Sequence, residues 1–419
     1  MALTAAFRLR IIEPLRENSA LLMVCIATGI IMLGQGVIAP VLPLYAKDFG
    51  VSATLVGMSI SVFGLARMLL NLPAGLLSDR FGRRILLVGG PAITALGSIL
   101  SAFAGDIWQL LAFRFIAGAG SAMFMTGAII LVTDISNSEN RARMLGLYQG
   151  SLLLGVSIGP ALGGLTAQLA GLRAPFVVVG LLAAGCALWA VRAMPETHPP
   201  GVALEPATDG ESDDLQYEGP FQLRSLFTNM GFALVSMVTF GIFFTRTGSR
   251  QTILALMGSE ELGISAGGIG AIFAVMAFIN LAMIAPAGAW ADRFGRKRVI
   301  VPSTFVIAGA LALFAVTGNI AVFLLVSVIL AVGSGLAGPA PAAYAADVIP
   351  AAGRGVGMGL YRTYSDIGFV AGPPLLGWIA DSTGSFGWAL GFNAALMAVA
   401  GLIFAIFARE TLVRRTAPP

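Results

Sequence analysis

Long apolar stretches alternate with short clusters of charged residues along the whole chain. A helix needs about 20 predominantly apolar residues to cross the hydrocarbon core of a bilayer. Applied to this pattern, that length predicts twelve membrane-spanning helices. We expect the spans at residues 20–45, 52–77, 85–103, 108–133, 142–170, 174–194, 227–257, 264–291, 299–318, 320–346, 355–380 and 387–408. The pattern therefore indicates an all-α integral membrane protein.

The second half of the chain repeats the first at an offset of 213 residues, as from Gly50 to Gly263. The segment PAGLLSDRFGRR at 73–84 matches PAGAWADRFGRK at 286–297 almost letter for letter. The same offset pairs further residues without a gap: Asp134 with Asp347, Arg141 with Arg354, Tyr148 with Tyr361, and Gly159-Pro160 with Gly372-Pro373. Such register indicates a tandem duplication, as in alternating-access carriers. We expect two homologous six-helix bundles, at residues 1–194 and 227–419.

The segment between the halves, residues 195–226, differs in composition from its surroundings. Residues 195–222 contain seven acidic side chains and five prolines but neither Lys nor Arg. Such a segment cannot bury enough apolar surface to form a core. We expect a flexible acidic linker on the cytoplasmic side.

Composition and charge agree with a membrane protein. Hydrophobic residues make up 57% of the chain and charged residues 11%, whereas a typical soluble domain has about 25% charged residues. The net charge is only +4, which gives no indication of nucleic-acid binding. The N-terminal stretch 7–18 lacks a small-residue cleavage site, so we expect an interfacial segment rather than a removable signal peptide.

The positions of the cations predict the orientation, because Lys and Arg accumulate in cytoplasmic loops. With both termini in the cytoplasm, the outer face keeps only Lys47 and Arg173. The inner face then carries the remaining loop cations: Arg8, Arg10, Arg16, Arg80, Arg83, Arg84, Arg141, Arg143, Arg192, Arg224, Arg293, Arg296, Lys297, Arg298, Arg354, Arg409, Arg414 and Arg415. We expect a multi-pass protein of the cell's inner (plasma) membrane.

The repeated charged motif resembles the signature of the major facilitator superfamily, and the resemblance extends over essentially the whole chain. It places a carboxylate beside arginines at the membrane edge, after spans 2 and 8. The resemblance implies the major facilitator fold and a cytoplasmic latch between the halves. The implied latch residues are Gly75, Asp79, Arg80, Gly82, Arg83 and Asp134, with their repeats Gly288, Asp292, Arg293, Arg296 and Asp347. A simple positive-inside anchor would explain the arginines but not the repeated aspartates.

Span 5 is similar to the antiporter motif that occurs mainly in exporters of this superfamily. Its small and kinking residues are Gly155, Gly159, Pro160, Gly163 and Gly164. Proline removes a helix hydrogen bond and glycines allow close helix approach, so we expect a kinked, tightly packed interface. The resemblance implies export, although glycine-rich packing is also common in membrane helices that serve other functions.

Spans 1 and 4 resemble those of twelve-helix drug:proton antiporters. Residues 36–45 carry the first pattern, and Arg114 with Gly118 and Gly120 carries the second. Ala117 departs from the second pattern, where Gln is common. This departure weakens the drug-antiporter assignment and leaves the superfamily resemblance intact.

Charged groups inside the membrane are costly and mark functional sites by default. Those at mid-depth are Arg67, Arg114, Arg246, Arg362 and Asp366, with Arg250 somewhat further out. Asp366 lies about 20 Å and Arg67 about 18 Å from the cytoplasmic ends of their spans, so the two share one height. We expect Asp366 to carry the coupling proton, with Arg67 or Arg362 as its partner. A static salt bridge is the alternative.

Three of these arginines give an indication of the charge of the substrate. Because spans 1, 4, 7 and 10 line the central cavity in this family, the resemblance implies that Arg114, Arg246 and Arg250 face it. More arginine than acid in a cavity favours anionic or zwitterionic cargo. Alternatively, these arginines bond helix carbonyls and fix the packing.

These residues and the resemblance together imply a proton-coupled secondary transporter that exports small amphipathic compounds or drugs by alternating access. The alternatives are a carrier of organic anions, sugars or lipids, by uptake or flipping, and a non-transporting membrane sensor. We expect a monomer whose partners are a small-molecule substrate, protons and the lipid bilayer.

Enzymatic chemistry finds little support in the sequence. The only histidine, His198, lies in the linker, Cys25 and Cys186 lie within apolar spans, and no phosphate-binding loop occurs. We therefore expect no catalysis, no cofactor, no metal site and no disulfide.

Overall fold

The computed structural model describes residues 18–137, 140–194, 196, 226, 228–350 and 353–412. Throughout these residues the regular secondary structure is helical. The expected interfacial segment 7–18, except for Asn18, lies outside the described residues. So does the expected linker, apart from Glu196 and Leu226.

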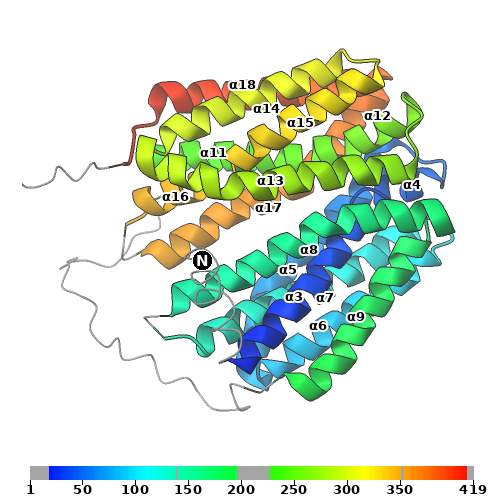
Figure 1. Cartoon of the computed structure of the whole chain (residues 1–419), viewed down its shortest axis with the longest axis vertical. Helices are drawn as coiled ribbons and strands as arrows, with labels where there is room; N and C mark the ends of the chain where they lie inside the picture. Colours follow the sequence, from blue (N-terminus) through cyan, green and yellow to red (C-terminus); the bar gives the residue numbers. More distant parts are fainter. Residues whose placement is uncertain are drawn as a thin grey trace, which may run out of the picture. The chain divides into compact units, whose positions relative to one another are not determined.

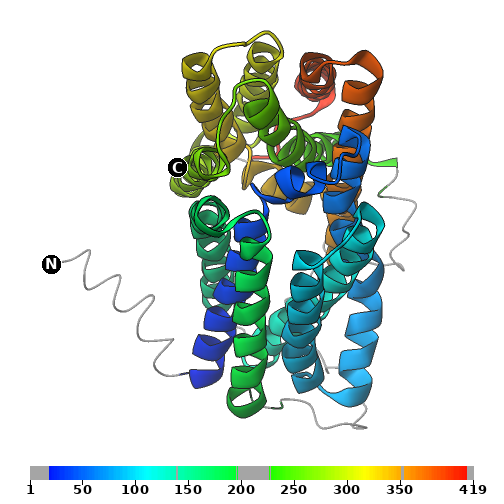
Figure 2. The same ribbon diagram turned by 90° about the vertical axis from the view of Figure 1, so that its right-hand side faces the viewer.

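The first of two compact units has its described residues within Met1–Val51, Met58–Ala203 and Ile264–Ala274. Its helices are α3 (Ser19–Ile38), α4 (Leu42–Lys47), α5 (Ala53–Phe81), α6 (Arg84–Ala102), α7 (Ile107–Asp134), α8 (Arg141–Ala170) and α9 (Ala174–Ala193). Figures 1 and 2 show these helices, coloured blue to green, running alongside one another.

The second unit has its described residues within Ser52–Gly57, Leu204–Gly263 and Val275–Pro419. Its elements are α11 (Met230–Phe244), the π-helix η2 (Thr245–Ile253), α12 (Leu254–Glu260), α13 (Ala266–Phe294), α14 (Lys297–Ala315), α15 (Ile320–Leu336), α16 (Ala340–Val348), α17 (Arg354–Thr383) and α18 (Phe386–Phe407).

Each expected membrane span coincides with helix, so the all-α prediction is confirmed. Among the described residues, eleven helices are long and apolar enough to cross a membrane. The remaining expected span, at 355–380, coincides with the 30-residue α17. Polar residues, glycines and the charge of Asp366 lower the hydropathy of this helix. It is therefore not among the eleven helices that meet the criterion for a membrane span.

Two expected spans are broken by proline. The span at 20–45 divides into α3 and α4 at a turn that contains Pro40, and the span at 320–346 divides into α15 and α16 at Pro339. Proline has no backbone N–H to donate and its ring collides with the preceding turn, so it ends a helix and is tolerated again in the next first turn. Both second helices, α4 and α16, have proline in that turn.

Among the described residues, six glycines have a backbone conformation with positive φ, and they form three pairs related by the offset of 213 residues. The angles are 70° and 63° at Gly50 and Gly263, 91° and 112° at Gly82 and Gly295, and 84° and 67° at Gly171 and Gly384. Residues with a Cβ rarely adopt such angles. The positions of the positive-φ glycines therefore repeat between the two halves.

Helices α3 and α8 pack backbone to backbone. A Cβ atom on Gly155 would lie 2.4 Å from the carbonyl oxygen of Gly29, and one on Gly159 would lie 2.5 Å from the Cα of Gly36. Four residues further along, a Cβ on Gly163 would lie 2.0 Å from the carbonyl oxygen of Val37. The motif of span 5 thus forms one face that admits no side chain.

In the second unit, α17 packs in the same way against span 7. A Cβ atom on Gly368 would lie 2.4 Å from the carbonyl oxygen of Phe240, and one on Gly372 would lie 2.7 Å from that of Phe244. Small residues let membrane helices approach closely and gain van der Waals contact. Close glycine contacts therefore recur at corresponding interfaces of the two units.

We predict that Gly159→Ala lowers the thermal stability of the purified protein, because its methyl group overlaps the backbone of Gly36. Overpacking of this kind costs about 1–3 kcal/mol. The matched control is Gly146→Ala on the same helix, where a Cβ meets no described atom within 4 Å. Both variants gain helix propensity, by about 1 kcal/mol. Equal melting temperatures of the two variants in detergent would contradict this packing argument.

Candidate functional site

The turn between α5 and α6 holds a buried arginine. Gly82 takes a positive φ of 91° there, and Arg83 immediately precedes α6 with only 3% of its surface exposed. A buried guanidinium is costly unless its charge and its N–H groups are matched. Its environment therefore decides whether this turn is stable.

Arg83 meets two of the predicted latch carboxylates. Its Nη1 lies 2.6 Å from Oδ1 of Asp79, and its Nε lies 3.2 Å from Oδ2 of Asp134. Nη1 also donates to Oγ of Ser78 at 3.0 Å. Burial disfavours the charge of Arg83, but these hydrogen bonds and the two carboxylates outweigh it and raise the pKa of the guanidinium. The cluster ties the end of α5 to the end of α7.

Glu196 adds a contact that sequence reasoning missed, because it was assigned to the linker. Its carboxylate accepts hydrogen bonds from the backbone N–H groups of Arg83 at 2.9 Å and Arg84 at 3.1 Å. A carboxylate at a helix N-terminus satisfies free N–H groups and complements the helix dipole. A residue three positions beyond the end of α9 thus caps α6.

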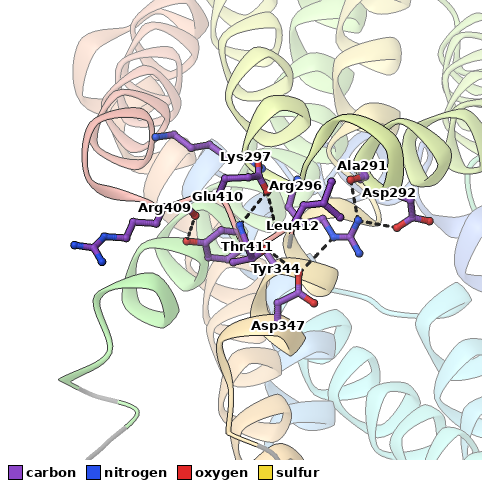
Figure 3. Close-up of polar contacts among 10 residues, drawn as sticks. All are labelled: Ala291, Asp292, Arg296, Lys297, Tyr344, Asp347, Arg409, Glu410, Thr411 and Leu412. Carbon is purple, nitrogen blue, oxygen red and sulfur yellow. Dashed lines mark hydrogen bonds and ion pairs between the residues drawn. The ribbon is translucent and has the colours of Figure 1, made fainter. Parts of the chain in front are cut away.

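The second unit contains the matching cluster, shown in Figure 3. Nη1 of Arg296 lies 2.7 Å from Oδ1 of Asp292 and donates to the carbonyl oxygen of Ala291 at 2.8 Å. Nε of Arg296 forms an ion pair with Oδ2 of Asp347 at 3.5 Å, too long for a good hydrogen bond. Thr411 donates its hydroxyl to the same oxygen of Asp347 at 2.7 Å. One arginine again joins two carboxylates from different helices.

Glu410 repeats the role of Glu196. It accepts hydrogen bonds from the N–H groups of Arg296 at 2.8 Å and Lys297 at 3.1 Å, and so caps α14 (Figure 3). The sequence carries a signal for this pair, since Glu-Thr follows the last helix of both halves, at Glu196 and at Glu410.

The other predicted latch residues lie around these clusters. Arg80 and Arg293 are exposed, and each places its guanidinium over the following phenylalanine ring, at 5.2 and 5.3 Å from the centroids. A Cβ atom on Gly75 or Gly288 would meet no described atom within 4 Å. These two glycines therefore have open space beside them in the described part of the chain.

Of the predicted cavity arginines, Arg114 is the most buried. It lies on α7 with 6% of its surface exposed, and its guanidinium stacks on the ring of Phe63 at 4.6 Å from the centroid. Its Nε is buried without a hydrogen-bond partner among the described residues. The aromatic ring compensates part of the cost of burying this cation.

Arg246 and Arg250 lie on the π-helix η2 and are half-buried. Within the described residues neither forms an ion pair or a hydrogen bond to a carbonyl, and Nε of Arg250 is buried without a partner. The expectation that such arginines fix packing through helix carbonyls is therefore not met at these two positions.

Asp366 lies half-buried in α17. Arg362, one turn earlier, is exposed and forms no ion pair with Asp366 in the described structure. The proposed local pair is therefore not formed. Arg67 lies in the first unit, and its pairing with Asp366 stays a prediction. Tyr361, on the same helix, accepts a hydrogen bond from the hydroxyl of Thr239 at 2.8 Å and so connects α17 to α11.

The remaining predicted motif, that of span 5, serves the α3–α8 interface described above. Pro160 lies within the continuous α8, and Gly164 packs against Gly270 of the same unit. Cys25 and Cys186 are buried free thiols. In the described residues, no group of His, Cys, Asp and Glu side chains is arranged to hold a metal ion.

Known proteins are similar to this chain in sequence. The chain is 25% identical to an uncharacterised MFS-type transporter of Methanocaldococcus jannaschii, over 91% of this chain and 96% of the relative. It is 24% identical to multidrug resistance protein 1 of Bacillus subtilis, over 87% of this chain and 91% of the relative.

A solved structure has the same fold. This is a bacterial homologue of the human lysosomal transporter Spinster, in an inward-facing, unoccupied conformation. It superposes with a TM-score of 0.78 at 16% identity, covering 92% of this chain and 96% of that chain.

A family model described as the Major Facilitator Superfamily matches residues 24–257 and 235–419, which is nearly the whole chain. The helical spans, the paired charged turns and these matches agree. The chain is a multi-pass membrane transporter that belongs to the major facilitator superfamily.

Proposed function

We propose that this transporter exports small amphipathic compounds, drugs among them, in exchange for protons. The similarity to multidrug resistance protein 1 of Bacillus subtilis over most of both chains supports drug export. The glycine face of α8, in the motif that resembles the exporters' motif, also supports this direction.

Proton coupling rests on one observation. In the described helices, Asp366 is the only carboxylate placed away from the helix ends. A carboxylate in a low-dielectric environment responds strongly to a neighbouring cation, since desolvation favours its neutral form and an opposite charge favours its ionised form. A cycle that brings a cation to Asp366 and removes it again would bind and release one proton.

The conformational cycle is proposed to use the charged turns. Arg83 with Asp79 and Asp134, and Arg296 with Asp292 and Asp347, would stabilise one state and loosen in the other. We propose that residues 1–194 and 227–419 move as two bodies joined by the cytoplasmic linker 195–226. In this scheme the protein acts as a monomer in the inner (plasma) membrane with both termini in the cytoplasm.

A carrier of organic anions, sugars or lipids is the second candidate, favoured by the unpaired Arg246 and Arg250. A sensor that binds without moving its ligand is the third. Flux through proteoliposomes under an imposed pH gradient, with ethidium and 2-naphthoate as probes of opposite charge, separates the three. An exporter gives gradient-driven flux of ethidium, a carrier of organic anions gives flux of 2-naphthoate, and a sensor gives no flux of either probe.

We predict that Asp366→Asn abolishes gradient-driven flux while probe binding survives. The amide preserves size and hydrogen bonding but cannot exchange a proton. Initial rates are expected to fall to those of protein-free liposomes. The matched control is Asp106→Asn, because Asp106 caps α7 and Asn is an equally good cap. Full gradient-driven flux in Asp366→Asn would place the proton site elsewhere, and loss of folding would favour a static salt bridge.

We predict that Asp79→Asn slows turnover more than it weakens probe binding. Asp79 is 55% exposed and Arg83 keeps Asp134, so the stability cost is only about 0–1 kcal/mol. The measurements are initial flux rates, equilibrium binding and melting temperature on one preparation. Asp79→Glu retains the charge and is expected to recover part of the rate. Unchanged turnover in Asp79→Asn would argue against a latch.

A further inference from the structure

The seventh membrane span is interrupted by a π-helix at its centre. Residues 245–253 form η2, between α11 and α12 of the span Met230–Glu260. The π-helix is rare in proteins. It occurs mostly as a single turn inside an α-helix, frequently at a functional site. A nine-residue π-helix deep in a membrane span therefore requires specific support from its neighbours.

That support comes from buried polar contacts on two sides of η2. Asn393 of α18 donates to the hydroxyl of Thr245 at 3.0 Å and to that of Ser249 at 2.7 Å. Thr247 donates to the carbonyl oxygen of Phe369 in α17 at 3.0 Å. All three hydroxyl residues are at most 3% exposed. These faces of η2 are fixed by α17 and α18 and are closed to a ligand.

Arg246 and Arg250 follow Thr245 and Ser249 by one position, so they occupy a neighbouring face of η2. This face is only half-buried. Residues four apart in this helix lie about one turn apart, so the two like charges are neighbours and repel each other. No described carboxylate neutralises either arginine, and Nε of Arg250 is buried without a partner.

We propose that Arg246 and Arg250 form the binding site for the anionic group, a carboxylate or a phosphate, of an amphipathic cargo. Two unneutralised guanidinium groups held side by side in a membrane span are costly, and an anion that accepts their N–H groups would remove that cost. Arginine suits this role because its planar fork binds such anions in a bidentate manner.

The surroundings also indicate the rest of the cargo. Phe243, half-buried one turn before Arg246, lies with its ring centroid 5.9 Å from the Arg246 guanidinium. An anion bound here would have an aromatic side chain beside it. The site therefore fits an anion with an apolar or aromatic body better than a small hydrophilic anion.

The inference rests on the proposed transport function but is tested by binding alone. Purified full-length protein in nanodiscs of neutral phosphatidylcholine is titrated with 2-naphthoate and with naphthylmethylammonium, which share the ring and differ in charge. Binding to protein-free nanodiscs is subtracted. We expect naphthoate to bind at least about tenfold more tightly than the ammonium probe, and Arg246→Gln/Arg250→Gln to lose about tenfold or more of that affinity.

Two further variants separate charge from structure. Arg246→Lys/Arg250→Lys keeps both charges and is expected to retain the preference for naphthoate. Arg192→Gln removes an exposed cation at the end of α9 and is expected to bind naphthoate like the parent protein. If the double Gln variant does not fold, the single variant Arg250→Gln and the comparison of probes on the parent protein still decide the matter.

Equal affinity for both probes, tighter binding of the ammonium probe, or undiminished naphthoate affinity in the Gln variants would overturn the proposal. Competition by phosphatidylglycerol added to the nanodiscs would support the same anion site and identify a lipid headgroup as its source. Failure of gradient-driven flux with intact naphthoate selectivity would remove the proposed export function and leave this site standing. Gradient-driven flux of ethidium without naphthoate selectivity would support the proposed export function and overturn this anion site.

Discussion

Inside a bilayer no water is available to hydrogen-bond the backbone, so each N–H and C=O must find its partner within the protein. This constraint makes every span of this chain a helix. It also removes the hydrophobic attraction between helices, because lipid tails are as apolar as leucine. Helices must then associate through close van der Waals contact, which the glycine faces of α8 and α17 provide. The interfaces that hold each half together therefore depend on the absence of side chains.

The same constraint governs the charged turns at the ends of the spans. Arg83 and Arg296 are the second arginine of their turns, and each points inward to meet two carboxylates from different helices. The exposed Arg80 and Arg293 interact instead with adjacent phenylalanine rings. In each motif, the inward-pointing arginine thus connects helices, whereas the exposed arginine lies at the surface. Glu196 and Glu410 complete each turn by capping the following helix.

Charge inside the spans is unbalanced in favour of arginine. Arg114 is partly compensated by the ring of Phe63, whereas Arg246 and Arg250 lack a described counter-charge. A protein that keeps such cations in its membrane-spanning part needs something to stabilise them. Cargo, lipid headgroups and aromatic rings can each stabilise these cations. The selectivity of the transporter is therefore linked to the packing of its seventh span, which holds Arg246 and Arg250.

The sequence by itself determined the helical class, the spans and the internal repeat, because long apolar runs and an ungapped offset are properties of the chain order alone. It also identified the paired motif residues Asp79, Arg83 and Asp134 that the fold brings together. Only the tertiary structure decided the rest. The π-helix depends on Asn393, which lies far along the chain, and the caps depend on where α9 and α18 end. Local pattern could not reveal these contacts, since each joins residues that are distant in sequence and adjacent only after packing.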